Sequence, residues 1–185
     1  MSIYRDDKAA AQPHVLVCSG LDPSGGAGFL ADARVVSSLG ARPVGVVTAL
    51  TVQNTLGVQQ VQACDAELVG AQLACLLGDV EVHAVKLGIL GSPQVARELG
   101  YGLDLTAAPV VWDPVAAPSR GRVVFDAGEF AEILKVLTPH LALITPNIIE
   151  LGLFAGGEIT DRESAIAAAR AVIARVGDVH VLVKG

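Results

Sequence analysis

The chain has 185 residues, of which 52% are hydrophobic and 17% are charged, and its formal net charge at pH 7 is −6. This length and composition are typical of a folded domain with a substantial core, and they exclude an intrinsically disordered chain. The negative charge has the wrong sign for a surface that neutralises nucleic-acid phosphates, so we expect no nucleic-acid partner.

Cysteine usage and the distribution of apolar residues indicate a cytoplasmic protein. Cys18, Cys64 and Cys75 are odd in number and form no C-x-x-C pair, which argues against a disulfide framework and a zinc site. The sequence contains no run of about 18 apolar residues, the length that spans a membrane. Residues 1–14 contain no apolar segment behind a basic one, so we expect neither a membrane span nor a secretion signal.

Short β-branched segments alternate with segments of helical periodicity. The predicted strands are residues 14–18, 43–48, 82–86, 110–113, 141–145 and 180–184. The predicted helices are residues 27–39, 66–77, 93–103, 128–137, 148–154 and 161–176. Nearly continuous apolar strands separated by helices indicate a parallel sheet covered on both faces, so we expect a three-layer α/β fold with residues 1–185 as one domain. Residues 51–63 are predicted to form an extra strand or a small flap.

A glycine-rich loop at residues 19–28 follows the first strand. Ligands of parallel sheets bind at the carboxyl ends of the strands, so this loop is a candidate for function. It matches neither a Walker loop nor a dinucleotide-binding fingerprint. Either it is a tight turn with an N-cap from Asp22 or Ser24, or its bare backbone lets a small ligand approach closely. Asp32, in the next helix, either reaches that ligand or is solvated.

Two other strand ends carry groups suited to a small ligand. Gln53 offers a donor and an acceptor that match the edge of an aminopyrimidine or pyridine ring, although an ordinary polar turn is the alternative. Lys86 ends another predicted strand beside Gly88, where a loop can run next to a ligand. Lys86 and Lys184 are two of only four lysines in the chain, and both fall at strand ends.

Oxygen-bearing side chains follow two further strands. Asp113 ends a buried strand, and Asn147 and Glu150 stand three positions apart at a predicted helix start. The bland interpretation of the last two is a capping box. The functional interpretation is that all three side chains converge on a hydrated Mg²⁺, which binds one or two carboxylates, waters and phosphate oxygens.

In their order and spacing, five segments resemble the hydroxymethylpyrimidine and phosphomethylpyrimidine kinases of thiamine biosynthesis, members of the ribokinase-like superfamily. They are G-L-D-P-S-G-G-A-G with A-D within residues 20–32, T-A-L-T-V-Q-N-T at 48–55, V-K-L-G-I-L at 85–90, D-P-V at 113–115 and T-P-N-I-I-E at 145–150. The resemblance implies a ribokinase-like fold with a central, mostly parallel sheet flanked by helices. It also implies an ATP- and Mg²⁺-dependent kinase for 4-amino-5-hydroxymethyl-2-methylpyrimidine and then its monophosphate.

The resemblance assigns roles to individual residues. Those expected at the pyrimidine are Gly20, Asp32, Gln53, Gly88 and Ile89. Those expected at Mg²⁺ are Asp113 and Glu150, and those expected at ATP are Asn147 and Lys184. Ile89 stands where many relatives carry Met, so it keeps the apolar wall beside the ring but loses the polarizable sulfur.

The family continues past the strand at residues 180–184 into a segment that holds an anion hole, the catalytic base and the adenine loops. The resemblance therefore places the catalytic residues beyond Gly185. We expect the C-terminal part of the fold to be missing, the 185 residues alone to be a poor kinase, and exposed apolar surface to favour a homodimer. The alternatives are a pyridoxal kinase, whose substrate has a similar ring and hydroxymethyl group, and a non-catalytic pyrimidine-binding module. A sugar kinase is less favoured, since Gln53 suits an aromatic edge.

Overall fold

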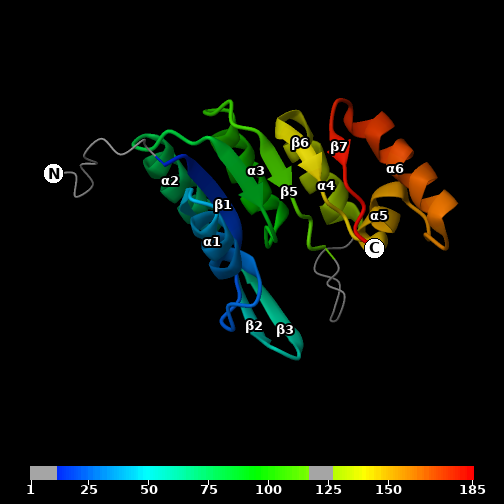
Figure 1. The fold of residues 1–185 in the computed structure, drawn as a ribbon, viewed down its shortest axis with the longest axis horizontal. Helices are drawn as coiled ribbons and strands as arrows, with labels where there is room; N and C mark the ends of the chain where they lie inside the picture. The colour runs from blue at the N-terminus through cyan, green and yellow to red at the C-terminus, as the bar shows by residue number, and fades with distance from the viewer. Residues whose placement is uncertain (1–11, 117–126) are drawn as a thin grey trace.

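The structure, a computed structural model, describes residues 12–116 and 127–185. The expectation that residues 1–14 contain no secretion signal therefore falls mostly on residues outside the described ones. Its strands are β1 (His14–Leu21), β2 (Arg42–Asn54), β3 (Gly57–Ala63), β4 (Ala84–Leu87), β5 (Val110–Trp112), β6 (Leu141–Ile144) and β7 (His180–Val181). They form one sheet in the order β3-β2-β1-β4-β5-β6-β7 (Figure 1). All neighbouring strands are parallel except β2 and β3, which form an antiparallel hairpin.

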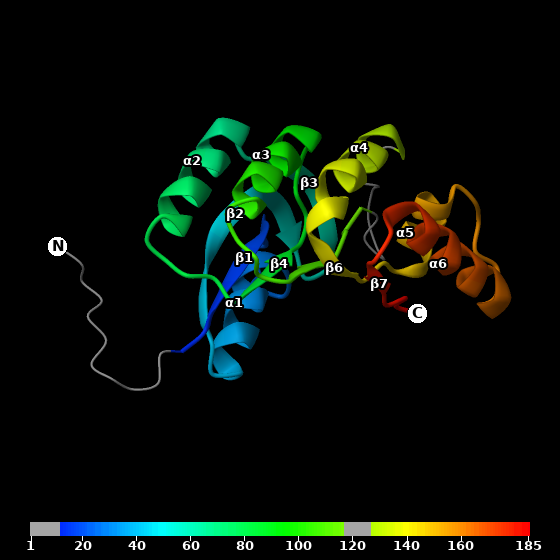
Figure 2. The ribbon, with the colours of Figure 1, turned by 90° about the horizontal axis from the view of Figure 1, so that it is seen from above.

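Helices cover both faces of this sheet. They are α1 (Gly28–Ser38), α2 (Ala66–Leu77), α3 (Pro93–Leu103), α4 (Ala127–Leu137), α5 (Ile148–Ala155) and α6 (Arg162–Val176), with a 3₁₀ turn at Thr138–His140. Helices α2, α3 and α4 lie side by side on one face and α1 lies on the other, while α5 and α6 lie at the β7 end (Figure 2). The predicted three-layer α/β fold is confirmed.

Helices α2 and α3 have the predicted bounds because the sequence carries their caps. The Asp65 side chain accepts a hydrogen bond from the Leu68 N–H at 2.9 Å, and Gly78 follows α2 as its C-cap. Ser92 accepts from the Val95 N–H at 3.2 Å, with Pro93 in the first turn of α3. Such caps satisfy N–H groups that have no partner within the helix, so they fix where a helix begins.

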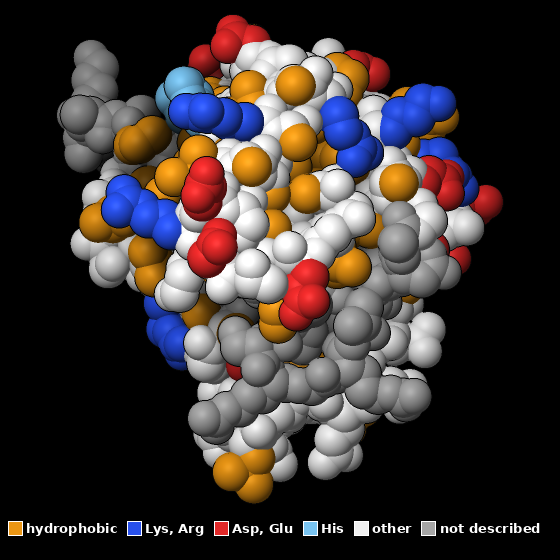
Figure 3. Space-filling view, turned by 90° about the vertical axis from the view of Figure 1, so that its right-hand side faces the viewer, with side chains coloured by type: hydrophobic (Ala, Val, Ile, Leu, Met, Phe, Trp, Pro, Cys, Tyr) orange, Lys and Arg blue, Asp and Glu red, His pale blue; other side chains and the backbone are white. Residues whose placement is uncertain are grey.

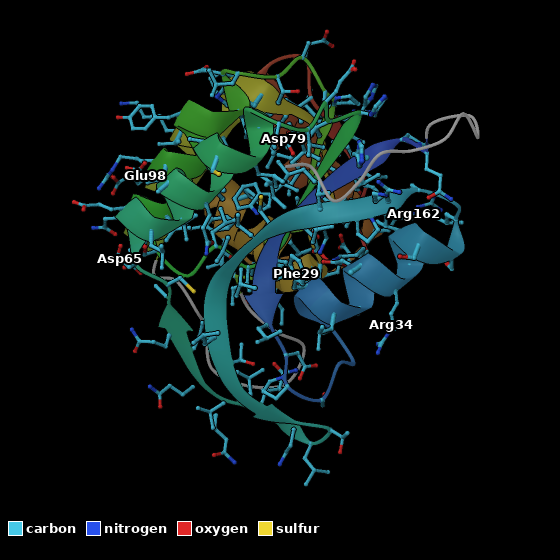
Figure 4. All side chains as sticks on the ribbon, turned by 90° about the vertical axis from the view of Figure 1, so that its left-hand side faces the viewer. Phe29, Arg34, Asp65, Asp79, Glu98 and Arg162 are labelled. Atoms are coloured by element: carbon cyan, nitrogen blue, oxygen red, sulfur yellow. The ribbon has the colours of Figure 1, made fainter. Side chains whose placement is uncertain are left out.

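Strand β2 is longer than predicted. It continues to Asn54, so Gln53 lies within a strand and not in a polar turn after it. The chain turns at Asn54, whose side chain accepts from the Leu56 N–H at 2.9 Å, and returns as β3, which is the predicted extra strand. Figure 4 shows this hairpin extending away from α1, which carries the labelled Arg34, and from α2, which follows the labelled Asp65. The two helices lie on opposite sides of β2.

Strand β7 is shorter than predicted. Only His180–Val181 pair regularly with β6, and Lys184 then forms an isolated parallel bridge with Asn147. Apolar side chains of α5, α6 and the residues after β7 are exposed on this side of the molecule, among them Ile149, Ile166, Ile173 and Leu182. Figure 3 shows apolar and basic side chains interspersed there. Within residues 12–116 and 127–185, no helix combines the length and apolar character needed to cross a bilayer.

An aromatic cluster joins β5 to two helices. The rings of Trp112, Phe130 of α4 and Phe154 of α5 have centroid separations of 5.7, 6.0 and 4.4 Å. All three side chains are buried, and the Trp112 Nε1–H has no hydrogen-bond partner among the described residues. Trp112 therefore stabilises the fold through packing, because its polar group makes no compensating bond.

We expect Trp112→Ala to lower the free energy of unfolding by about 3–5 kcal/mol, since it leaves a large cavity in the core. Trp112→Phe should cost clearly less, because it keeps most of the packing and removes an N–H that has no partner. Urea unfolding measures both, with Leu39→Ala as the control because Leu39 is 80% exposed. A loss for Trp112→Ala no larger than that for Leu39→Ala would contradict this account of the cluster.

Candidate functional site

A cavity of about 390 Å³ lies at the carboxyl ends of β1, β2, β4 and β5, against the start of α1. Its volume suits one heteroaromatic ring with small substituents. The predicted site residues that line it are Gly20, Asp32, Gln53, Ile89 and Asp113. Residues far apart in the sequence thus meet at one edge of the sheet, and Asp32 and Gln53 lie at the same cavity, as predicted.

The glycine-rich loop folds around the carboxylate of Asp22, which is only 3% exposed. Its Oδ1 accepts from the Ser24 N–H at 2.8 Å, and its Oδ2 accepts from the N–H groups of Gly26 at 3.1 Å and Ala27 at 3.0 Å. Neither Asp22 nor Ser24 is the N-cap of α1, which is Ala27 without a side-chain cap. Of the two interpretations of this loop, the one with an N-cap from Asp22 or Ser24 is therefore wrong, and Asp22 instead organises the loop before the helix.

These hydrogen bonds set the ionisation of Asp22. Burial alone raises the pKa of the carboxyl group, but the bonds from Ser24, Ala27 and Gly26 outweigh it and hold the pKa below its ordinary value. Asp22 is therefore a fixed anion at neutral pH. Sequence reasoning assigned it no site role, although an Asp followed two positions later by Ser and then by glycines is typical of a side chain that accepts from the loop backbone.

Gly20 and Ile89 form one wall of the cavity. A Cβ added at Gly20 would lie 2.4 Å from Cγ2 of Ile89, so the bare backbone at this position is required by close packing. The buried Thr48 of β2 donates its hydroxyl to the carbonyl of Ile89 and fixes that residue from the other side. The predicted apolar wall at Ile89 therefore lies at the cavity.

Asp32 of α1 is paired with Lys86 of β4. The Lys86 Nζ lies 2.5 Å from Asp32 Oδ2, and the two side chains are 27% and 22% exposed. Gly88 does not line the cavity but makes room for this pair, since its added Cβ would lie 2.2 Å from Ser19 Oγ and 3.1 Å from Lys86 Nζ. The sequence indicated Lys86 as a strand-end residue but gave no sign of its partner.

Gln53 reaches the cavity from the β2–β3 hairpin, together with Val58 and Val61 of β3. In the described parts of the chain, its carboxamide makes no hydrogen bond to the protein. Both its donor and its acceptor are therefore available to a ligand. The two valines beside it supply an apolar surface for the face of a flat ring.

A second cluster lies beside the cavity, at the ends of β5, β6 and β7. The Lys184 Nζ donates to Asp113 Oδ1 at 2.6 Å, and the Lys184 backbone N–H donates to the Pro146 carbonyl at 2.9 Å. Lys184 also pairs with Asn147 through the isolated bridge. The structure thus brings the predicted ATP residues Asn147 and Lys184 next to Asp113, which faces the cavity.

Glu150 joins this cluster to the loop after β5. Its side chain completes the capping box by accepting from the Asn147 N–H at 2.8 Å, and its other oxygen accepts from the Ala116 N–H at 3.1 Å. Val115, just before Ala116, has a φ of 43°, which is strained for a β-branched residue. Glu150 is 1% exposed and holds the loop that carries Asp113.

The donor set fits a hydrated magnesium ion and not a metal held by protein alone. Among the residues that the structure describes, no three His, Cys, Asp or Glu side chains are grouped to hold a metal. Mg²⁺ takes most of its ligands from water and phosphate and needs only one or two carboxylates. Asp113, which lines the cavity and is paired with Lys184, is a carboxylate that could provide one of them.

None of the three cysteines lines the cavity. All three are free, and Cys18 lies buried in β1. Burial raises the pKa of the Cys18 thiol to about 12, so it stays protonated and cannot act as a nucleophile at neutral pH. The prediction that the cysteines form no disulfide holds for the described structure.

Comparisons with known proteins show the family and the fold of the chain. Residues 22–185 match the family described as phosphomethylpyrimidine kinase. The hydroxymethylpyrimidine/phosphomethylpyrimidine kinase of Rhizobium meliloti (strain 1021) is 35% identical over 170 residues, which cover 92% of this chain and 64% of the relative. The chain therefore spans less than two thirds of that protein.

Two solved structures share the fold. The phosphomethylpyrimidine kinase of Clostridium difficile 630 superposes with a TM-score of 0.82 at 30% identity, covering 94% of this chain and 75% of the other. The pyridoxal kinase of Staphylococcus aureus in complex with AMP-PCP and pyridoxal gives a TM-score of 0.82 at 28% identity, covering 95% of this chain and 63% of the other. Both similarities cover nearly the whole of this chain.

We expect Asp22→Asn to lower the free energy of unfolding by about 1–3 kcal/mol at pH 7, because an amide NH₂ then faces backbone donors. The folded-state pKa of Asp22 is lowered, so its contribution is complete above its unfolded pKa and is lost as the pH falls through the folded pKa. The difference between wild type and variant should therefore shrink below about pH 4. Urea unfolding from pH 7 to pH 2.5 measures it, and a difference independent of pH would contradict the assignment.

Gly20→Ala should destabilise the protein by about 1–3 kcal/mol, because the new methyl group forces Ile89 out of its packed position. Gly157→Ala is the matched control, since a Cβ there meets no atom within 4 Å. Thermal or urea unfolding compares the two variants. Equal stability of both would show that Ile89 gives way freely and that the wall is not closely packed.

Proposed function

Since the chain belongs to the phosphomethylpyrimidine kinase family, we propose that it forms the substrate side of a kinase that transfers the γ-phosphoryl group of ATP to a hydroxymethylpyrimidine. The proposed substrate is 4-amino-5-hydroxymethyl-2-methylpyrimidine, and its monophosphate is the substrate of a second transfer. The observation that carries the proposal is the cavity itself. It is lined by the Gln53 carboxamide, by the Asp32 carboxylate and by apolar side chains.

The cavity supports a specific orientation of the substrate. Gln53 pairs with the ring edge that carries the amino group and a ring nitrogen, because one amide offers both a donor and an acceptor. Gly20 and Ile89 on one side, and the valines of β3 on the other, pack against the ring. The hydroxymethyl group then points away from the hairpin, toward Asp113 and the Lys184 cluster.

The transfer itself is a substitution at phosphorus. The hydroxymethyl oxygen attacks the γ-phosphorus of ATP, a new O–P bond forms, the bond from that phosphorus to the β-bridging oxygen breaks, and ADP leaves. The alcohol proton passes to a general base. We expect this base and the anion hole in the segment that the resemblance places after Gly185, since positioning and electrostatic stabilisation supply most of the rate.

The residues for the nucleotide lie around β5, β6 and β7. We propose that Asn147 and Lys184 contact the phosphates of ATP and that Asp113 and Glu150 hold Mg²⁺, Glu150 acting through the loop it braces or through bound water. When bound, Mg²⁺ neutralises charge on the phosphates. The similar pyridoxal kinase of Staphylococcus aureus was solved in complex with AMP-PCP, which supports ATP as the phosphoryl donor.

A pyridoxal kinase is the second candidate, favoured by the similarity to the Staphylococcus pyridoxal kinase. Pyridoxal also carries a hydroxymethyl group on a six-membered nitrogen ring, so the apolar walls would accept it. It has no exocyclic amino group to pair with the Gln53 carboxamide. The ratio of kcat/KM for the two alcohols therefore distinguishes the two functions.

We further propose that the protein acts in the cytoplasm as a homodimer on small molecules, with neither nucleic acid nor membrane as a partner. The formal charge of −6 argues against nucleic acid. Exposed apolar side chains on the β2–β3 hairpin, including Leu50, Val52 and Leu56, provide surface for a second subunit.

The product of the complete gene should consume ATP in the presence of the hydroxymethylpyrimidine in a coupled assay. Gln53→Ala should lower kcat/KM for the pyrimidine by about 10- to 100-fold, because two hydrogen bonds to the ring edge are lost. Gln60→Ala is the matched control, since Gln60 lies on the same hairpin but is exposed and does not line the cavity. Its kcat/KM should stay close to that of wild type.

Two outcomes would overturn the kinase proposal. Calorimetric binding of the pyrimidine without ATP turnover in the complete protein would establish a non-catalytic binding module. Faster turnover of pyridoxal than of the pyrimidine, with equal loss for both in Gln53→Ala, would assign the protein as a pyridoxal kinase.

A further inference from the structure

The charges that line the cavity are unbalanced. Of the described residues, three carboxylates line it, from Asp22, Asp32 and Asp113, and a single ammonium group, from Lys86. Asp22 is occupied by the N–H groups of its own loop, and Asp113 is paired with Lys184. A neutral alcohol can enter such a cavity without difficulty, but a phosphomonoester dianion is repelled unless a cation meets it.

Lys86 is placed to be that cation. Its ammonium has three donor hydrogens, and Asp32 is its hydrogen-bond partner among the described residues. The pair is about one quarter exposed, so water and small ions reach it from the cavity. Gly88 leaves open the space beside Nζ, which lies 3.1 Å from where a Cβ would be. The ammonium can therefore turn toward a ligand while its stem stays on β4.

Lys184 is less suited to this role. It contacts Asp113 but is not among the described residues that line the cavity. Lys184 lies beside Asn147, so it is better placed to contact a phosphate of ATP. The two lysine–aspartate pairs thus stand at different points along the proposed path of phosphoryl transfer, with Lys86 beside the pyrimidine and Lys184 beside ATP.

We propose that Lys86 binds the phosphate of the phosphomonoester substrate and so determines whether the second phosphorylation can occur. The inference rests on the proposed function. With the alcohol in the cavity, Lys86 stays on Asp32. With the monophosphate, the ammonium donates to a phosphate oxygen as well, and this charge-assisted bond offsets the repulsion from Asp32 and Asp113. A lysine suits this exchange, because its compact ammonium group sits on a flexible side chain. It lacks the rigid, bidentate geometry of an arginine guanidinium.

The test compares the two substrates in the product of the complete gene. Lys86→Met should lower kcat/KM for the monophosphate by about 10- to 100-fold more than kcat/KM for the alcohol, the range expected when one charge-assisted hydrogen bond is lost. Lys86→Arg, which keeps a cation, should recover part of the ratio. Lys135→Met is the matched control, since Lys135 is an exposed lysine on α4, and it should leave the ratio unchanged.

A purely structural role for Lys86 predicts a different result. If the pair with Asp32 only holds α1 against β4, Lys86→Met lowers the unfolding midpoint and lowers kcat/KM for both substrates by the same factor. That result overturns the inference. Should Lys86→Met fail to fold, the double variant Lys86→Met/Asp32→Asn removes the pair without leaving an unpaired charge. Its ratio of the two kcat/KM values is compared with that of Asp32→Asn alone, and an unchanged ratio overturns the inference.

The same assay separates this inference from the function on which it rests. If wild type phosphorylates neither the alcohol nor the monophosphate, the proposed function fails and the inference fails with it. If wild type phosphorylates both and Lys86→Met affects them equally, only the role of Lys86 is overturned. Calorimetric titration with the monophosphate in the absence of ATP provides a second readout, in which Lys86→Met should weaken binding by a similar factor.

Discussion

Parallel pairing brings the carboxyl ends of β1, β2, β4 and β5 to one edge of the sheet, and each group of the cavity depends on that alignment. The bare backbone of Gly20 is useful only because β4 places Ile89 against it. Gln53 reaches the same space because β2 continues past its neighbours and turns back as β3. The antiparallel hairpin thus adds a wall that a purely parallel sheet could not supply, since its strands stop at the shared edge.

The three aspartates at the cavity differ in what neutralises them, and this determines what each can do. Asp22 is buried and its lone pairs are taken by backbone N–H groups, so it is fixed and shapes the loop. Asp32 and Asp113 are paired with lysines at 2.5 and 2.6 Å, in positions that water reaches. Ion pairs in such positions are weak enough to exchange partners, because solvent screens them. Only these two can respond to an incoming phosphate.

The sequence predicted the features that depend on local signals. The α/β alternation, the bounds of α2 and α3 and the capping box at Asn147 each depend on residues close together in the sequence, and the structure has them. The length of β2 was missed because its polar end, around Gln53, lacks the apolar run that marks a buried strand, and pairing with β3 stabilises it instead. The pair of Lys86 with Asp32 joins residues 54 positions apart, so no local pattern could reveal it. Roles given by resemblance, such as Glu150 at Mg²⁺, stay predictions.

The capping and functional interpretations of Glu150 do not exclude each other. One oxygen caps α5 through Asn147, and the other holds Ala116, next to Val115 with its strained φ of 43°. A strained residue of this kind costs about 1–3 kcal/mol, and a hydrogen bond to a charged acceptor contributes about 1.5–3 kcal/mol, so one bond from Glu150 is sufficient to hold the loop. That loop carries Asp113. Replacing Glu150 would therefore displace Asp113, the proposed magnesium ligand, whether or not Glu150 itself contacts magnesium.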